Sequence, residues 1–111
     1  MISVPDLFFS TRITATARQL GVEVTACAPD QLAERCRTAL PHLAIVDLHA
    51  PGNLDAVRAL RLDPATHELS VVGFYSHVDA ATRAAAIESG VTDVLPRSAF
   101  TARLALILRG D

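Results

Sequence analysis

Apolar and polar residues alternate along this chain in short blocks, and the spacing changes repeatedly between strand and helix periods. In the clearest block, Leu43–Asp47, four apolar residues run into an acid, and a Pro51-Gly52 turn signal follows. This pattern predicts a buried strand that ends at a loop. Asp47 then lies at the carboxyl end of a strand, where open parallel sheets place their ligand sites. The alternative is that Asp47 caps the turn, because aspartate is a favoured turn residue.

Four more segments have the apolar character of strands, and a helical pattern follows each strand. The predicted strands lie at 2–4, 22–26, 71–74 and 94–95. Glycine or proline ends most of the helices, at Gly21, Pro41, Asp63-Pro64 and Gly90. The helices are indicated by Phe9, Ile13, Ala17 and Leu20; by Leu32, Cys36 and Leu40; by Leu54, Val57 and Leu60; by the alanine-rich run 80–89; and by Leu104, Ile107 and Leu108.

Five strand and helix pairs in 111 residues predict one α/β domain, residues 1–111, with a parallel sheet covered on both faces. Right-handed crossovers leave few topologies for such a chain. We expect the flavodoxin-like (βα)5 three-layer sandwich, with a five-stranded parallel sheet in the order 2-1-3-4-5. The ends of the first and third strands are neighbours in this order, so Asp6 and Asp47 should meet at one edge of the sheet.

Composition and charge narrow the classes of partner. The chain is 50% hydrophobic with a formal net charge of −2, and its ten basic residues are all arginines scattered along the sequence. Nucleic acid is therefore not an expected partner. No apolar run is long enough to span a membrane, and no secretory signal begins the chain, so we expect a cytoplasmic protein. Cys27 and Cys36 form no CxxC pattern and are expected to be small buried hydrophobes.

Several residues that can carry chemistry follow the predicted strands. Asp47 begins the segment DLHAPG, Ser76 follows the strand at 71–74, and Arg97 lies in VLPRSAF after the last strand. With these residues the chain resembles the CheY-like receiver domains of two-component response regulators over nearly its whole length. Asp47 resembles their phospho-accepting aspartate, Ser76 their hydroxyl residue, and Arg97 stands where they carry lysine. Gly90 resembles the glycine before their last strand.

The resemblance implies a stand-alone domain for phosphorelay signal transduction rather than an enzyme. A histidine kinase or phosphotransfer protein would phosphorylate Asp47, and Ser76 and Arg97 would contact the phosphoryl oxygens. Mg²⁺ would be held by Asp6, Asp47 and the backbone carbonyl of His49, since a carboxylate that attacks a phosphoryl group needs a cation to offset the charge repulsion. The signal would pass to a downstream protein. A homodimer could form through the helix at 80–89, the strand at 94–95 and the final helix.

The sequence also departs from the receiver pattern. Pro5 stands in place of the first of two adjacent acids, which removes one expected metal ligand. Arg97 replaces a compact ammonium with a planar guanidinium, so it would meet a phosphoryl oxygen differently. Ser98 stands in place of the usual proline, and Val94 lies near the position of the family's switch aromatic. These departures predict an atypical receiver.

Other interpretations stay open at this stage. Asp6 precedes a helix and could simply cap it. Arg97 could pair permanently with Asp47, and the domain could then be a phosphorylation-independent pseudo-receiver adaptor. Residues 47–52 also spell DxHxxG, a pattern of cobalamin-binding domains, but here it follows the third strand instead of the first. Cobalamin is therefore the most distant alternative.

Overall fold

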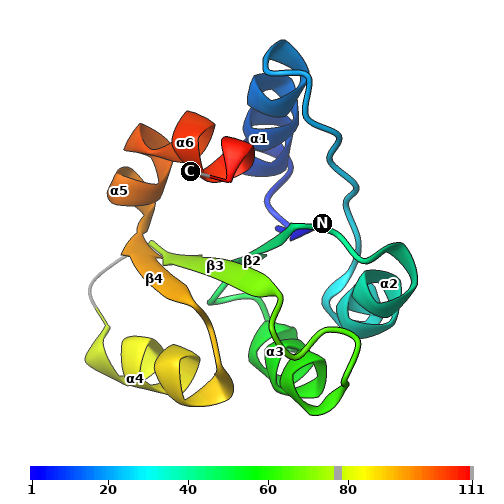
Figure 1. Ribbon diagram of the computed structural model, residues 1–111. Coiled ribbons are helices and arrows are strands. Elements are labelled where there is room, and N and C mark those ends of the chain that lie inside the picture. The colour runs from blue at the N-terminus through cyan, green and yellow to red at the C-terminus, as the bar shows by residue number, and fades with distance from the viewer. Residues whose placement is uncertain (77–78, 111) are drawn as a thin grey trace.

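A parallel sheet lies between two layers of helices in the computed structural model, which describes residues 1–76 and 79–110 (Figure 1). Its four strands run in the order β1-β2-β3-β4, and every neighbouring pair is parallel. They are β1 (Ile2–Ser3), β2 (Leu43–Asp47), β3 (Ser70–Tyr75) and β4 (Asp93–Pro96). The predicted α/β class with a parallel sheet is confirmed.

The second of the five predicted strands, at 22–26, is not formed as a strand. This segment makes a single parallel bridge, between Ala26 and Ile2. The Ile2 amide donates to the Thr25 carbonyl at 2.9 Å, and the Cys27 amide donates to the Ile2 carbonyl at 2.9 Å. In this parallel register Ala26 is the residue of the segment that lies opposite β1. The segment thus lies on the predicted side of β1, but the sheet has four strands instead of five.

Helices cover both faces of the sheet, so the three-layer prediction holds (Figure 1). One layer contains α1 (Leu7–Gln19), α5 (Arg97–Ala102) and α6 (Leu104–Arg109). The other contains α2 (Leu32–Ala39), α3 (Asn53–Leu62) and α4 (Ala80–Ser89), with the 3₁₀ turn η1 (Pro29–Gln31) before α2. Within the described ranges 1–76 and 79–110, no helix is both long and apolar enough to cross a bilayer.

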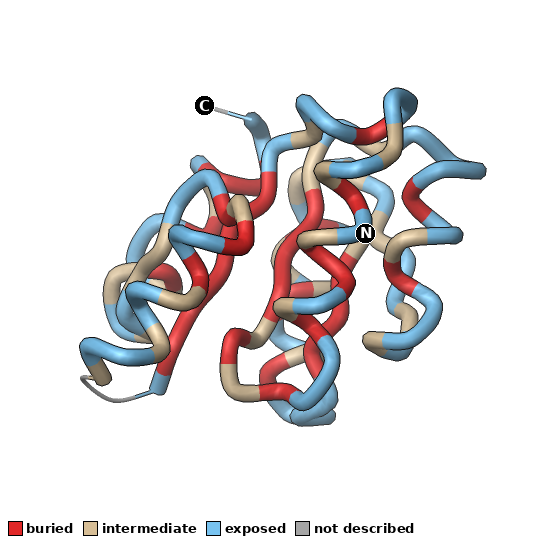
Figure 2. Tube along the Cα trace, turned by 90° about the horizontal axis from the view of Figure 1, so that it is seen from below, coloured by how far each residue is buried: buried red, intermediate tan, exposed pale blue. Residues whose placement is uncertain are grey.

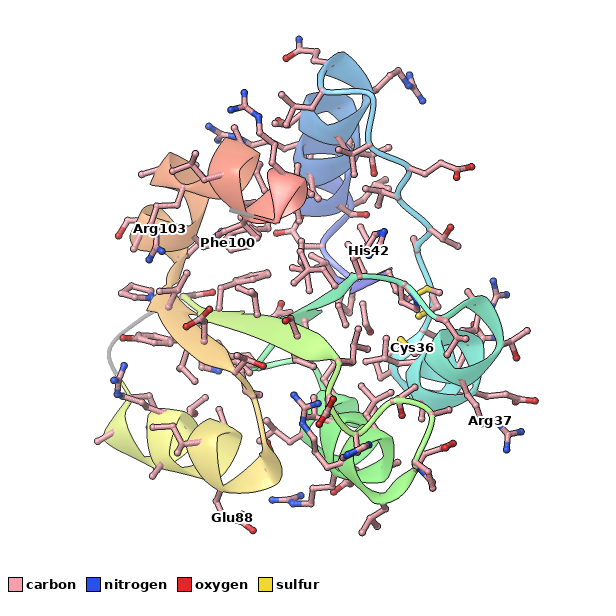
Figure 3. All side chains as sticks on the ribbon, in the orientation of Figure 1. Cys36, Arg37, His42, Glu88, Phe100 and Arg103 are labelled. Carbon is pink, nitrogen blue, oxygen red and sulfur yellow. The ribbon has the colours of Figure 1, made fainter. Side chains whose placement is uncertain are left out.

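Two clusters of buried side chains fill the spaces between the layers, one on each face of the sheet. The buried parts of the chain run through the middle of the molecule, and the outer sides of the helices are exposed (Figure 2). Cys36 faces inward from α2, whereas Glu88 projects from the outer side of α4 (Figure 3). Burial of the Cys36 thiol raises its pKa to about 11, which agrees with its predicted role as a small core residue.

The second helix ends where the sequence predicts, before Pro41. Leu40 is 61% exposed and ends α2 in a left-handed conformation with φ 48°. Pro41 disfavours the right-handed helical conformation at the residue before it, so the helix ends there. The predicted final helix, at Leu104, Ile107 and Leu108, is α6, and a short helix that was not predicted, α5, precedes it, with Arg103 at φ −104° and ψ 9° between them.

Candidate functional site

The carboxyl ends of the strands bring the predicted residues to one edge of the sheet. Asp47, the last residue of β2, is in register with Phe74 of β3, and Phe74 is in register with Leu95 of β4. Ser76 is exposed directly after β3, and Arg97 is the first residue of α5, directly after β4. Residues distant in the sequence therefore come together at the edge where parallel α/β sheets bind ligands.

Asp47 is half-buried and is held by its own loop. Its Oδ1 accepts a hydrogen bond from the backbone N–H of His49 at 2.9 Å. A side-chain oxygen that accepts from the backbone two residues later forms an Asx turn. The turn-capping alternative for Asp47 is thus present in the geometry, and it occupies one of the two carboxylate oxygens.

Asn53 is a buried residue of the site that the sequence reasoning missed. Its side chain is fully buried at the start of α3. The Nδ2 group donates to the Ser3 carbonyl at 3.0 Å and to the Asp47 carbonyl at 2.9 Å. One amide therefore joins the ends of β1 and β2 and fixes the backbone of Asp47. The only sequence signal is an asparagine directly after a Pro-Gly turn, which is ordinarily typical of a loop.

Asp6 caps the first helix, as the alternative interpretation proposed. Its Oδ1 accepts from the Phe9 backbone N–H at 3.2 Å, and its Oδ2 lies 3.4 Å from Nη2 of Arg97. The hydrogen bond from Phe9, followed by the interaction with Arg97, holds the pKa of Asp6 below its ordinary value. Both oxygens of this carboxylate therefore have partners within the chain.

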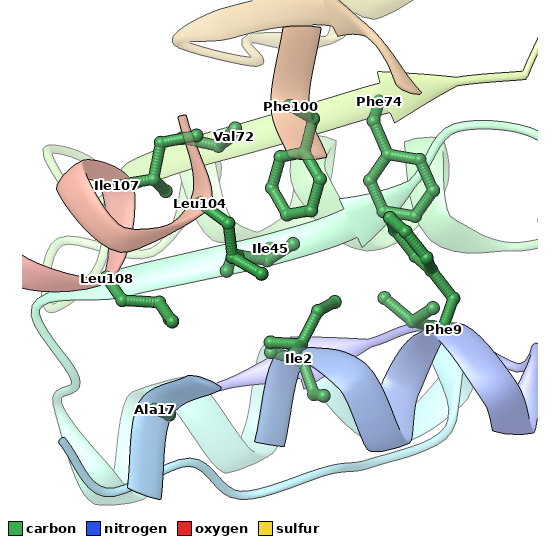
Figure 4. Close-up of a cluster of buried hydrophobic side chains, with 12 residues drawn as sticks. Ile2, Phe9, Ala17, Ile45, Val72, Phe74, Phe100, Leu104, Ile107 and Leu108 are labelled. Carbon is green, nitrogen blue, oxygen red and sulfur yellow. The ribbon is translucent and has the colours of Figure 1, made fainter. Parts of the chain in front are cut away.

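Arg97 lies between the acid and an aromatic ring. Its Cζ is 4.0 Å from the centroid of the Phe9 ring, within the range of a cation–π contact. Phe9 in turn packs edge-on against Phe74, with ring centroids 4.9 Å apart, and both rings touch Phe100 (Figure 4). In the part of the chain that the structure describes, the acidic partner of Arg97 is Asp6 and not Asp47. No local pattern in the sequence indicates that Phe9 supports the guanidinium.

The side chains at this edge are a poor match to a magnesium site. Mg²⁺ is held in proteins by one or two carboxylates, usually with several waters. Asp6 already uses its oxygens for the helix cap and for Arg97, and Pro5 contributes no acid. Across residues 1–76 and 79–110, no three side chains of His, Cys, Asp or Glu are grouped as a metal site. The predicted set of Asp6, Asp47 and the His49 carbonyl stays a prediction, and Asp6 does not fit it as arranged here.

Comparison with known proteins identifies the fold. The chain matches no family model and no curated protein by sequence. A structure described as a response regulator from Chloroflexus aurantiacus superposes with a TM-score of 0.82 at 23% identity, over 97% of this chain and 94% of its own. The fold is that of a receiver domain. The NarL receiver domain from Mycobacterium tuberculosis gives a TM-score of 0.80 at 19% identity, covering 98% and 90% of the two chains.

Another protein with the receiver fold provides a contrast at the acidic edge. The receiver domain of the sensor histidine kinase PA1611 from Pseudomonas aeruginosa matches with a TM-score of 0.82 at 19% identity, over 99% of this chain and 95% of its own. That structure has a magnesium ion coordinated in its active-site cleft. At such low identity the likeness concerns the fold alone, so the roles of individual residues in this chain depend on its own geometry.

Proposed function

We propose that this chain is a signalling receiver that accepts a phosphoryl group on Asp47 and transmits the change through protein contacts. One observation carries the proposal: Asp47, Ser76 and Arg97 follow three neighbouring parallel strands at the same edge of the sheet. An acid, a hydroxyl and a guanidinium are the groups that a phosphoryl acceptor site uses. The donor would be a histidine kinase or a phosphotransfer protein.

The chemistry of each residue follows from its group. One oxygen of the Asp47 carboxylate would attack the donor's phosphorus and break its bond to the donor's histidine nitrogen, which leaves as the imidazole, and the other oxygen would remain fixed by the His49 amide. The Ser76 hydroxyl, which is exposed, could donate to one phosphoryl oxygen. Arg97 would move from Asp6 to another phosphoryl oxygen, because a doubly charged anion attracts a guanidinium more strongly than one exposed carboxylate does.

Movement of Arg97 would also change the surface near the site. Arg97 begins α5 and covers Phe9, so its departure would uncover the ring and free the first turn of α5 to shift. α5 directly follows the edge strand β4, and β4 is adjacent to α4 in the chain. We propose α4, β4 and α5 as the surface that contacts a downstream protein or a second copy of this chain.

A second candidate is an adaptor that acts without phosphorylation. The specific observation in its favour is that Arg97 already has an acidic partner, so a cation is paired at this edge before any phosphate arrives. In this case Asp47 would have only its structural role in the turn. The two candidates differ in one measurable property, which is the reactivity of Asp47.

Incubation with a small phosphodonor, acetyl phosphate, tests the proposal. Intact-mass measurement should show the gain of one phosphoryl group, and Asp47→Asn should abolish it. Asp55→Asn is the matched control, since Asp55 is an exposed acid on α3 that pairs with Arg58. A wild-type chain that gains no phosphoryl group, with or without Mg²⁺, would exclude phosphorylation and favour the adaptor.

A further inference from the structure

We infer that Arg97 occupies the place at Asp6 that a divalent cation would need, so that this domain neutralises its acidic edge with its own guanidinium and excludes Mg²⁺. Exclusion of Mg²⁺ would regulate the proposed phosphorylation site, and in that respect it rests on the proposed function. Its test, however, is metal binding in the absence of any phosphodonor, so the two can fail separately.

Asp6 already has two partners within the chain. One carboxylate oxygen accepts the Phe9 amide at 3.2 Å, and the other faces the Arg97 guanidinium at 3.4 Å. A metal ion bound at Asp6 would lie beside one of these partners. At Oδ2 this partner is the Arg97 guanidinium, whose positive charge opposes a second cation at the same oxygen.

Arg97 is held from two sides. The guanidinium lies 4.0 Å from the centre of the Phe9 ring, and this ring is 5% exposed and fixed against Phe74 and Phe100. Arg97 itself is only partly accessible, with 37% of its side chain exposed. The cation is therefore positioned over a rigid aromatic surface as well as paired with an acid. A lysine would have no planar face to lie on this ring.

The charges of Asp6 and Arg97 balance each other at this edge of the sheet. A receiver with two adjacent acids before its first helix gathers negative charge that a metal ion can offset. Here Pro5 removes one of those positions, and Asp6 and Arg97 together carry no net charge. A divalent ion would meet a nearby positive charge, and of the predicted ligands only the Asp47 carboxylate and the His49 carbonyl would remain beside it. Both the loss of ligands and the repulsion between cations oppose binding.

Titration with MgCl₂ at constant ionic strength, followed by the backbone amide resonances of residues 6, 47 and 49, tests the inference. The wild-type chain should show no saturable shift in the millimolar range. Arg97→Ala should bind Mg²⁺ at least about tenfold more tightly, because it removes both the competing partner and the like charge. Arg97→Gln should give the same gain with more of the side-chain volume retained.

Two further variants assign the effect to Asp6. Arg97→Ala combined with Asp6→Asn should return to the wild-type lack of binding. Arg18→Ala is the matched control, because it removes the same charge from the far end of α1 and should leave Mg²⁺ binding unchanged. Saturable binding to the wild-type chain as tight as to Arg97→Ala would overturn the inference. So would the absence of any gain in both Arg97 variants, or a gain that persists without Asp6.

Discussion

Replacement of Asn53 by alanine should destabilise the domain strongly, although Asn53 is neither apolar nor catalytic. The substitution removes two hydrogen bonds, to the Ser3 carbonyl at 3.0 Å and to the Asp47 carbonyl at 2.9 Å. Ser3 is fully buried, so its carbonyl would lose its partner away from water. A buried polar group left unpaired costs about 1–3 kcal/mol, and the cavity adds to this, so we expect a loss of about 2–4 kcal/mol in unfolding free energy.

Asn53→Asp separates hydrogen bonding from shape. Aspartate has nearly the same volume, but its ionised side chain accepts hydrogen bonds and cannot donate to two carbonyls. We therefore expect this variant to be at least as unstable as Asn53→Ala at neutral pH. Gln31→Ala serves as a control, because Gln31 makes one exposed hydrogen bond to the Ala28 amide and its loss should change stability by less than about 0.5 kcal/mol.

Equilibrium urea unfolding, followed by far-ultraviolet circular dichroism, measures these changes. The midpoint should fall for both Asn53 variants while the dependence on urea stays constant, which would indicate a change in stability and not in the unfolded state. Asn53→Asp with wild-type stability, or Asn53→Ala with a loss under about 1 kcal/mol, would refute the assignment of Asn53 as the donor that joins the two strand ends.

Three other substitutions test the fold by urea unfolding. Arg61→Ala should lower the unfolding free energy by about 2–4 kcal/mol, because Arg61 donates to several backbone carbonyls. The control, Arg58→Ala, removes an exposed arginine and should cost much less. Equal losses in the two variants would contradict this role of Arg61. Gly73→Ala should cost about 1–3 kcal/mol, since its Cβ would lie 2.5 Å from Leu48 Cδ2. The same substitution should cost less in a Leu48→Ala background, and an undiminished cost there would show that the clash lies elsewhere. The hydrogen bond from the Thr82 hydroxyl is the main cause that lowers the pKa of Asp79 in the folded state. The stabilisation from this carboxylate is therefore present above its ordinary pKa and is lost as the pH falls through the lowered value. Urea unfolding at a series of acidic pH values should show a smaller loss of stability for Asp79→Asn than for the wild-type chain.

The sheet edge could be predicted from the sequence because strand ends are marked by local chemistry. The apolar run before Asp47 ends at an acid and a turn, and Gly90 has φ 106°, which glycine adopts readily at the end of a helix. These signals depend only on neighbouring residues. The order of parallel strands then follows from right-handed crossovers, so the meeting of distant residues at one edge did not require any contact to be known.

Features that depend on a partner elsewhere in the chain could not be predicted in this way. The alternation at 22–26 is typical of a strand, but in the fold this segment makes only one bridge to β1, between Ala26 and Ile2. Asn53 is polar and follows a turn, so nothing local shows that it is fully buried between two strand ends. The spacing of Phe9 predicts only that it belongs to the first helix, and its contact with Arg97 arises when α1 and the end of β4 come together.

The two departures at the acidic edge have a common physical explanation. Proline at position 5 takes away one acid, and the remaining acid, Asp6, is left with a single charge to be balanced. The long, planar side chain of Arg97 reaches this acid at 3.4 Å while lying on Phe9, a geometry that suits guanidinium better than ammonium. Lysine would carry the same single charge, so arginine at position 97 changes the geometry of the ion pair with Asp6 and not the charge balance. Arg97→Lys in the present chain should therefore weaken the contact with Asp6, and Mg²⁺ affinity should fall between those of the wild-type chain and Arg97→Ala.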